Sequence, residues 1–368
     1  MNRIQWPRPR IYEATVCLPL AQSVLDAPRK VQAMYLHFVG IDIAAATFTA
    51  AWHTDKQWHS VTFDQRRTDY GRLAHQLRRL APPAQTLVVM EATGTYWLAL
   101  AWFLHEAGFG VSVINPLQAK LFARLEMQHA KTDRIDAHLL AEFARQRQPA
   151  RWAPPPRIAE QLQQRLSQRD ALLGIKTEEA NRLHALRQNP HAEPSILDRL
   201  ERHIAYLQTE IDTLEQELSD LLAGDHPWSE AARRLQTIPG IGLMAAAWLL
   251  AATHCFAYCD TPEQAAAFAG LVPYRQESGT TRRGHRAVGR GGHAALRKTL
   301  YMATLSAARG NPCVKPLYER LLARGKPNKV ARVASARKLI HIAWAVVVKE
   351  RDFDPGFAPQ PDPLAVGA

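Results

Sequence analysis

The chain has 368 residues, of which 47% are hydrophobic and 22% charged, as in a globular protein of two or three domains. Lysine and arginine total 46 against 34 aspartates and glutamates, and the net charge of +12 indicates a polyanionic partner, nucleic acid before a membrane surface. The apolar runs are too short to span a bilayer, and the N-terminus lacks the order of a signal peptide. We therefore expect a cytoplasmic, nucleoid-associated protein without a membrane partner.

The four cysteines are too few and too scattered for a disulfide scaffold. His254, Cys255 and Cys259 resemble half of a zinc site, but no second pair of Cys or His completes it. We do not expect a zinc site.

Residues 1–34 show no clear periodicity, and Met34 directly precedes the first strong strand. We expect this leader to be disordered or misannotated, with translation starting at Met34 rather than Met1.

Residues 35–150 have the pattern of an α/β domain. Strands are predicted at 36–43, 47–52, 58–63, 86–90 and 111–114, helices at 67–80 and 96–107, and two further helical segments before residue 150. This order predicts a ribonuclease H-like (RuvC-like) fold.

The Pro154-Pro155-Pro156 run marks a domain boundary, and three further regions are predicted from residue 151 onward. Residues 151–228 form two charged helices, the second with a heptad seam from Leu197 to Leu221, which predicts a coiled-coil arm. An antiparallel hairpin and a pairing between chains are both compatible with this pattern. Residues 229–350 are predicted to be a mainly helical domain, and 351–368 a disordered tail.

The turn Ile238-Pro239-Gly240-Ile241-Gly242 precedes an apolar helix and resembles a helix-hairpin-helix motif. In such a motif, Gly240 and Gly242 would let backbone N–H groups approach a DNA phosphate. A plain tight turn before a core helix explains the same residues equally well.

Four acidic residues are predicted to converge in the first domain. Asp133 and Asp136 are one helical turn apart, Asp42 lies on the first strand, and Glu91 ends the strand expected beside it. An Asp-x-x-Asp pattern alone more often marks the first turn of a helix whose two carboxylates are exposed to solvent. Carboxylates from three elements, however, could hold one or two Mg²⁺ ions for phosphoryl transfer.

Between residues 271 and 300, seven Lys and Arg face one Glu, a net charge of +6 (7 − 1). The glycines of this stretch allow close backbone approach, and arginines bind phosphate oxygens bidentately. The candidate phosphate-binding residues are Arg275, Arg282, Arg283, Arg286 and Arg290. Ser278 is a candidate nucleophile, although the loop by itself favours an ordinary turn residue. Tyr274 is a rival nucleophile whose position after Val272-Pro273 suits packing better.

These motifs resemble the DEDD transposases of the IS one-ten group of insertion sequences, described as bridge-RNA-guided recombinases. The matching segments are Phe38–Asp42, Met90–Trp97, Asn115-Pro116, Lys131–Ala137, Pro239–Gly242, Gly270–Pro273 and Ser278-Gly279. The resemblance covers about residues 35 to 350. Ala44-Ala45-Ala46 departs from relatives that often carry Ser or Lys there, but no carboxylate or serine is lost.

The resemblance implies a bacterial enzyme in which Asp42, Glu91, Asp133 and Asp136 bind Mg²⁺ and Ser278 forms a covalent phosphoserine link with DNA. It also implies donor and target DNA, a structured non-coding guide RNA, and dimers that assemble into a tetramer.

Two alternatives remain. One is a metal-only RuvC-like nuclease, such as a Holliday-junction resolvase, in which Ser278 merely binds phosphate. The other is a non-enzymatic DNA- or RNA-binding regulator derived from a transposase.

Overall fold

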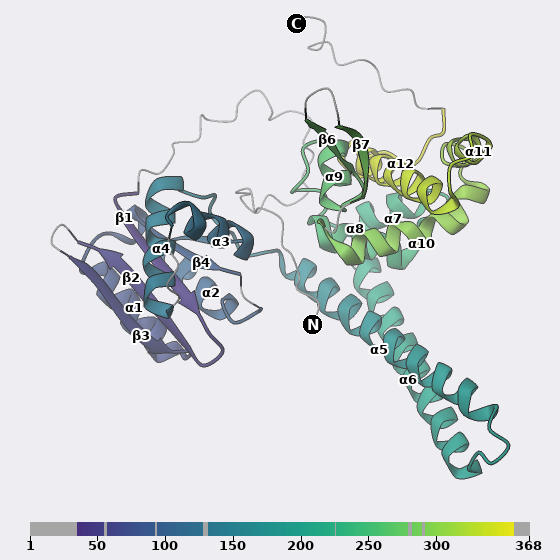
Figure 1. The fold of residues 1–368 in the computed structure, drawn as a ribbon, viewed down its shortest axis with the longest axis horizontal. Coiled ribbons are helices and arrows are strands. Elements are labelled where there is room, and N and C mark those ends of the chain that lie inside the picture. The colour runs from purple at the N-terminus through teal and green to yellow at the C-terminus, as the bar shows by residue number, and fades with distance from the viewer. Residues whose placement is uncertain are drawn as a thin grey trace, which may run out of the picture. The chain divides into compact units, whose positions relative to one another are not determined.

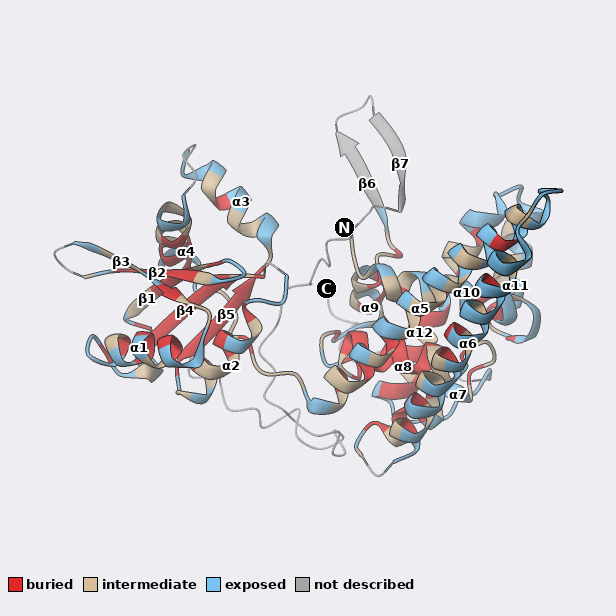
Figure 2. Cartoon of the chain, turned by 90° about the horizontal axis from the view of Figure 1, so that it is seen from below, coloured by how far each residue is buried: buried red, intermediate tan, exposed pale blue. Residues whose placement is uncertain are grey.

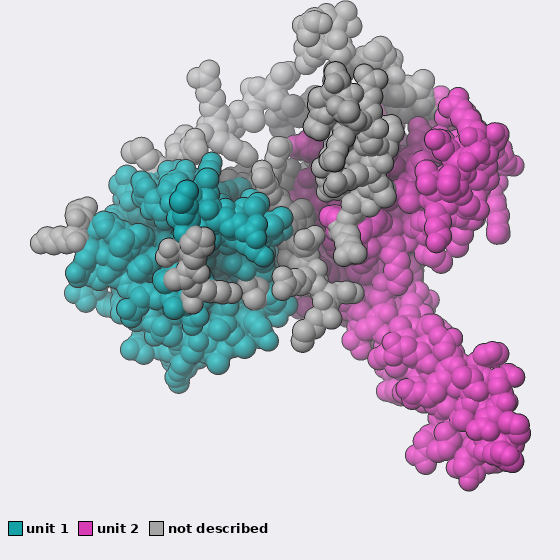
Figure 3. All heavy atoms as spheres, viewed as in Figure 1, with its two compact units in different colours: residues 1–155 teal, residues 156–368 magenta. Residues whose placement is uncertain are grey.

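The computed structural model describes residues 35–54, 57–92, 94–127, 132–224, 226–278, 282–288 and 291–356; within 274–288 it describes the backbone alone. The chain divides into two compact units, Met1–Pro155 and Pro156–Ala368 (Figure 3). The predicted leader, Arg290 and the predicted tail beyond residue 356 lie outside the described residues.

A five-stranded sheet forms the centre of the first unit, in the order β3-β2-β1-β4-β5 (Figure 1). The strands are β1 (His37–Ile43), β2 (Thr47–His53), β3 (Trp58–Asp64), β4 (Thr86–Glu91) and β5 (Gly110–Ile114). β1, β2 and β3 form an antiparallel meander, whereas β4 and β5 run parallel to β1. Each strand agrees with its predicted range to within one residue at either end.

Helices cover both faces of this sheet (Figures 1 and 2). They are α1 (Arg67–Arg78), α2 (Leu98–Glu106), α3 (Pro116–Leu125) and α4 (Asp133–Arg147), with a short 3-10 turn at Pro83–Gln85. Alternate residues of each strand face opposite sides of the sheet. Val88 and Met90 therefore pack with α1 and α2, and Leu87 and Val89 with α3 and α4.

The segment after α4 closes the first unit along β5. The Trp152 N–H donates to the Val111 carbonyl at 2.7 Å, and the Ser112 hydroxyl donates to the Ala150 carbonyl at 2.7 Å. The Trp152 ring also packs edge-on against Trp97 and is buried. The division between the two units thus falls inside the proline run.

Two long helices, α5 (Arg157–Arg187) and α6 (Pro194–Ala223), pack against each other. Arg165 bonds Glu217 at 2.8 Å and Arg187 bonds Glu201 at 2.7 Å, so the pair is antiparallel. Of the two pairings compatible with the sequence, the chain adopts the hairpin. Its buried seam on α6 follows the heptad spacing and consists of Leu200, Leu207, Ile211 and Leu218.

The rest of the second unit is mainly helical around one apolar core. Its elements are α7 (Ser229–Gln236), α8 (Leu243–Thr253), α9 (Pro262–Phe268), β6 (Pro273–Ser278), β7 (Arg282–Val288), α10 (Ala294–Gly310), α11 (Lys315–Ala323) and α12 (Asn328–Val348). Every residue of α8 from Ala245 to Thr253 is buried, because α5, α7 and α10 surround it. A helix that is apolar all round occupies the centre of a domain.

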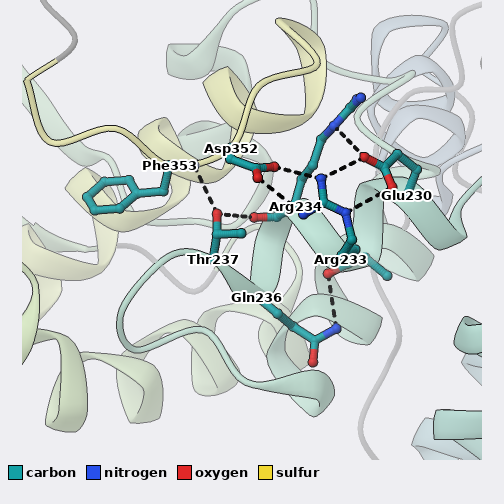
Figure 4. A network of polar contacts seen from close by, with 8 residues as sticks. Glu230, Arg233, Arg234, Gln236, Thr237, Asp352 and Phe353 are labelled. Atoms are coloured by element: carbon teal, nitrogen blue, oxygen red, sulfur yellow. Dashed lines mark hydrogen bonds and ion pairs between the residues drawn. The ribbon is translucent and has the colours of Figure 1, made fainter.

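The end of the described chain is held against α7 (Figure 4). Arg233 pairs with Glu230 at 2.7 Å and with Asp352 at 2.8 Å, and the Phe353 N–H donates to the Thr237 hydroxyl at 2.9 Å. Residues 351–356, which the sequence assigns to the tail, therefore include packed positions.

No helix within the described ranges is both long enough and apolar enough to span a membrane.

Candidate active site

Asp42 and Glu91 share one face of the sheet. Val39 and Ile41 pack with α1 and α2, so the intervening Gly40 and the next residue, Asp42, face α4. Leu87 and Val89 of β4 also face the α3 and α4 side, and Glu91 continues that alternation. Parallel pairing aligns Ile41 with Met90, so Asp42 and Glu91 follow at neighbouring strand ends.

Gly40 lets α4 cross β1 at close range. A Cβ at position 40 would overlap the Ala137 carbonyl oxygen and the Ala141 backbone nitrogen. Only glycine permits this approach, because the helix backbone occupies the space of a side chain. The contact sets α4 with its N-terminus at the edge that carries Asp42.

The first turn of α4 supplies the other two carboxylates. The Thr132 hydroxyl accepts a hydrogen bond from the Ile135 N–H at 3.3 Å and caps the helix, so Asp133 and Asp136 occupy its first turn. One turn further, His138 stacks on Trp58 of β3 with ring centroids 4.5 Å apart. This stack holds α4 over the sheet from the β3 side.

The other three carboxylates of this set act electrostatically on Asp42. Its pKa is raised to about 6, first because the group is partly buried, and then because Asp136, Asp133 and Glu91 carry like charges nearby. The Ile43 N–H bonds the carboxylate and opposes the rise. The structure therefore brings together the four acidic residues that the sequence singles out.

This donor set fits a hard divalent cation. Four carboxylates offer only oxygen ligands, and a cation among them would relieve the repulsion that raises the Asp42 pKa. Within the described ranges, no three His, Cys, Asp or Glu side chains are close enough to ligate one ion. The four carboxylates therefore interact electrostatically but do not form a complete set of metal ligands. Their side chains must move closer together to hold a metal ion.

Ser278 belongs to the second unit, at the end of β6. In backbone register it pairs with Arg282 of β7, the strand that also carries Arg283 and Arg286. Arg275 lies on β6 opposite His285. The described arginines predicted to bind phosphate therefore lie on the same two-stranded hairpin as the candidate nucleophile.

The base of this hairpin is fixed by Arg297 of α10. Its guanidinium donates to the Gly291 carbonyl at 2.7 Å and to the Gly270 carbonyl at 3.4 Å, so one side chain joins the chain before β6 to the chain after β7. Gly270 and Gly292 both have positive φ, and a Cβ on Gly292 would lie 2.5 Å from the Gly270 Cα. The two segments cross at a distance that only glycines allow.

A second contact supports the same base. The His293 N–H donates to the Phe268 carbonyl at 2.8 Å, and the two rings stack with centroids 5.9 Å apart. The His293 Nδ1 caps α10 by accepting from the Leu296 N–H, and burial lowers the His293 pKa. The neutral ring that burial favours is the form able to accept this bond.

The two glycines of the Pro239–Gly242 turn occupy different environments. Gly240 has φ +101°, and a Cβ there would lie 2.6 Å from the Ala307 Cβ of α10. Packing against Ala307 accounts for Gly240. Gly242 precedes α8 with open space around it, so of the two only Gly242 leaves room for an approaching phosphate.

Comparisons with known proteins agree with this architecture. A family model described as "Transposase", of the DEDD type, matches residues 39–189, and a model described as "Transposase IS116/IS110/IS902 family" matches residues 232–319. The sheet topology and the first match define a ribonuclease H-like domain of the DEDD class. Transposases of this class normally use divalent metal ions.

Several known proteins align with this chain over nearly their whole length. A pilin gene-inverting protein of Moraxella bovis is 29% identical over 86% of this chain and 97% of its own. The transposase for insertion sequence element IS1328 of Yersinia enterocolitica is 28% identical over 84% and 96%, and that for IS1111A of Coxiella burnetii 26% over 86% and 91%. The chain belongs to the IS110 family of DEDD transposases, enzymes that process DNA.

Two positioning residues carry no signal in the sequence that singles them out. The role of Gly40 depends on Ala137, 97 positions later, and that of Arg297 on a crossing of two glycine-containing segments.

Proposed function

We propose that this transposase cuts and rejoins DNA by Mg²⁺-dependent phosphoryl transfer through a covalent link to Ser278. The observation that carries its metal-dependent part is geometric: Asp42 and Glu91 follow at neighbouring strand ends, and the first turn of α4 carries Asp133 and Asp136. Burial and then these like charges raise the pKa of Asp42. Such a set of like charges destabilises a folded protein unless a cation is bound, and a protein that acts on DNA has a use for that cation.

Asp42, Glu91, Asp133 and Asp136 would hold the metal. When bound, Mg²⁺ supplies positive charge that stabilises the attacking and leaving oxygens of a phosphoryl transfer. The backbone contacts at Gly40 and the Thr132 cap support this role, because they hold the start of α4 at that edge. The side chains would then have to draw together around the ion.

Ser278 would act as the nucleophile. Its Oγ forms a bond to phosphorus as the bond between phosphorus and a deoxyribose oxygen breaks, the serine proton leaves, and the released hydroxyl takes up a proton. One phosphoester bond replaces another, so the DNA can be rejoined by the reverse step without an external energy source. Arg275, Arg282, Arg283, Arg286 and Arg290 would bind the flanking phosphates.

A structured non-coding RNA is the proposed guide for donor and target choice. The net charge of +6 between residues 271 and 300 supports binding of nucleic acid, RNA as well as DNA. The proposed assembly is a dimer that pairs into a tetramer through a coiled-coil arm. Exposed apolar side chains on that arm support a contact with another chain; they are Ile175, Ile196 and Tyr206.

The experiment is a Mg²⁺-dependent cleavage assay on a nicked element end, resolved under denaturing conditions. Wild type should leave protein joined to DNA, and Ser278→Ala should neither cut nor form the adduct. Asp133→Asn and Asp136→Asn should lose strand transfer while binding DNA normally. Cutting by Ser278→Ala would instead establish the metal-only nuclease.

A further inference from the structure

The segment from Lys315 to Lys338 carries the densest positive charge outside the β6–β7 hairpin. It contains eight Lys and Arg and one Glu, for a net charge of +7 (8 − 1) over α11 and the first half of α12, whereas the whole chain carries +12. No proposed catalytic role involves this segment.

Four of these cations cluster around the turn between α11 and α12, which we call the basic turn: Arg320, Arg324, Lys326 and Lys329. All four are exposed, and α11 lies at the rim of its unit in both ribbon views (Figures 1 and 2). No acidic side chain in the described part of the chain forms an ion pair with any of them. Exposed cations without acidic partners retain their full attraction for a polyanion.

The backbone under the basic turn is held by a local network. The Arg332 guanidinium lies over the Tyr318 ring at 5.5 Å and donates to the Asn328 side-chain oxygen at 2.8 Å. The Tyr318 hydroxyl bonds the same Asn328 oxygen at 3.2 Å. These contacts join α11 to the start of α12, so the four cations are presented on a fixed scaffold.

The chemistry of the surface favours a duplex over unpaired bases. Its single aromatic residue, Tyr318, is covered by Arg332, and the exposed apolar side chains nearby are Leu322 and Val330. Proteins that bind single-stranded RNA stack bases on exposed aromatic rings, whereas sequence-independent binding to a duplex backbone comes mainly from positive charge. The basic turn offers charge without stacking platforms.

We propose that the basic turn is a second, sequence-independent DNA interface that binds the phosphate backbone of duplex DNA. This proposal rests on the family's action on DNA and does not depend on Ser278 being the nucleophile. Such an interface would hold a DNA duplex whatever sequence is cut.

The test is DNA binding, followed by fluorescence anisotropy on a duplex of unrelated sequence. The Ser278→Ala background is used without added divalent cation, so that no strand is cut by either mechanism. The variant Arg320→Gln, Arg324→Gln, Lys326→Gln, Lys329→Gln should bind at least about tenfold more weakly near 0.1 M salt. The slope of log affinity against log salt should fall by about 2 to 4. Unchanged unfolding temperature and oligomeric state show that the fold is intact.

A matched control removes the same charge from the arm: Arg182→Gln, Arg187→Gln, Arg199→Gln, Arg202→Gln. Three of these arginines are paired, with Glu179, Glu201 and Asp198, so this variant should change the slope little. If both variants lose affinity equally, binding follows total charge and the proposal is overturned. The milder variant Lys326→Gln, Lys329→Gln should show about half the effect.

A second arm of the experiment uses an RNA hairpin. Weakened RNA binding with unchanged duplex DNA binding would assign the basic turn to RNA and overturn the proposal. None of these outcomes depends on whether Ser278 forms a covalent link.

Discussion

Gly40 of β1 lies against Ala137 of α4, so close that a side chain at position 40 would overlap the Ala137 carbonyl oxygen. This contact places the start of α4, with Asp133 and Asp136, beside the strand end that carries Asp42. The position of the proposed metal-binding residues therefore depends on a residue with no functional group.

Gly40→Ala is expected to push α4 away from β1, destabilise the first unit by about 1–3 kcal/mol and abolish DNA cleavage. Thermal unfolding and the cleavage assay measure the two effects. Gly71→Ala is the matched control, because Gly71 lies within α1 with no atom near the added Cβ. That change should leave activity intact and the fold at least as stable. Full activity of Gly40→Ala would show that α4 is not positioned by this contact.

The raised pKa of Asp42 predicts a pH dependence. In the folded protein its pKa is raised to about 6 from the ordinary value of 3.8, so the folded state holds this proton more tightly than the unfolded state. The contribution of Asp42 to stability is therefore greatest at low pH and is lost as pH rises from about 4 through about 6.

Thermal unfolding of wild type and Asp42→Asn without added divalent cation checks this sign. The variant should gain stability relative to wild type across that window, because it removes one of four like charges. Mg²⁺ should stabilise wild type above pH 6 and have little effect on the variant. Parallel pH curves for the two proteins would contradict the coupling. Glu106→Gln, an exposed carboxylate at the end of α2, serves as the control.

The first unit was predictable from sequence because its elements are marked locally. Apolar runs such as Thr86–Met90 mark the strands, and the placement of Asp42 and Glu91 follows from strand order. The contacts of Gly40 with Ala137 and of Gly240 with Ala307 join residues far apart in the chain, so no local pattern encodes them. The charge of the basic turn is visible in the sequence. Its exposure and lack of acidic partners are not, because they depend on how α11 packs on α12.

Gly240 and Gly242 are expected to separate a packing role from a phosphate-binding role. Gly240→Ala should destabilise the second unit by about 1–3 kcal/mol, because the Cβ meets Ala307 at an unfavourable φ. Gly242→Val should fold normally, since the space around it is open, but weaken DNA binding if α8 approaches a phosphate. Unchanged DNA affinity in a folded Gly242→Val protein would refute the helix-hairpin-helix assignment.

Arg297 is expected to position the hairpin that carries Ser278. Arg297→Lys cannot reach both carbonyls at once, so the adduct yield should fall about tenfold or more while DNA affinity changes little. The ratio of adduct formation to binding is the measurement. Lys298→Ala, an exposed neighbouring cation, should leave that ratio unchanged. Equal effects of the two substitutions would contradict a specific positioning role for Arg297.

The most direct measurement of the central claim is peptide mapping of the protein–DNA adduct by mass spectrometry. Wild type with Mg²⁺ and a nicked element end should yield a nucleotide joined to the peptide that contains Ser278, with fragmentation assigning the link to that serine. Asp42→Asn should yield none. A link on Tyr274, or cleavage of DNA without any protein-bound nucleotide, would contradict the account.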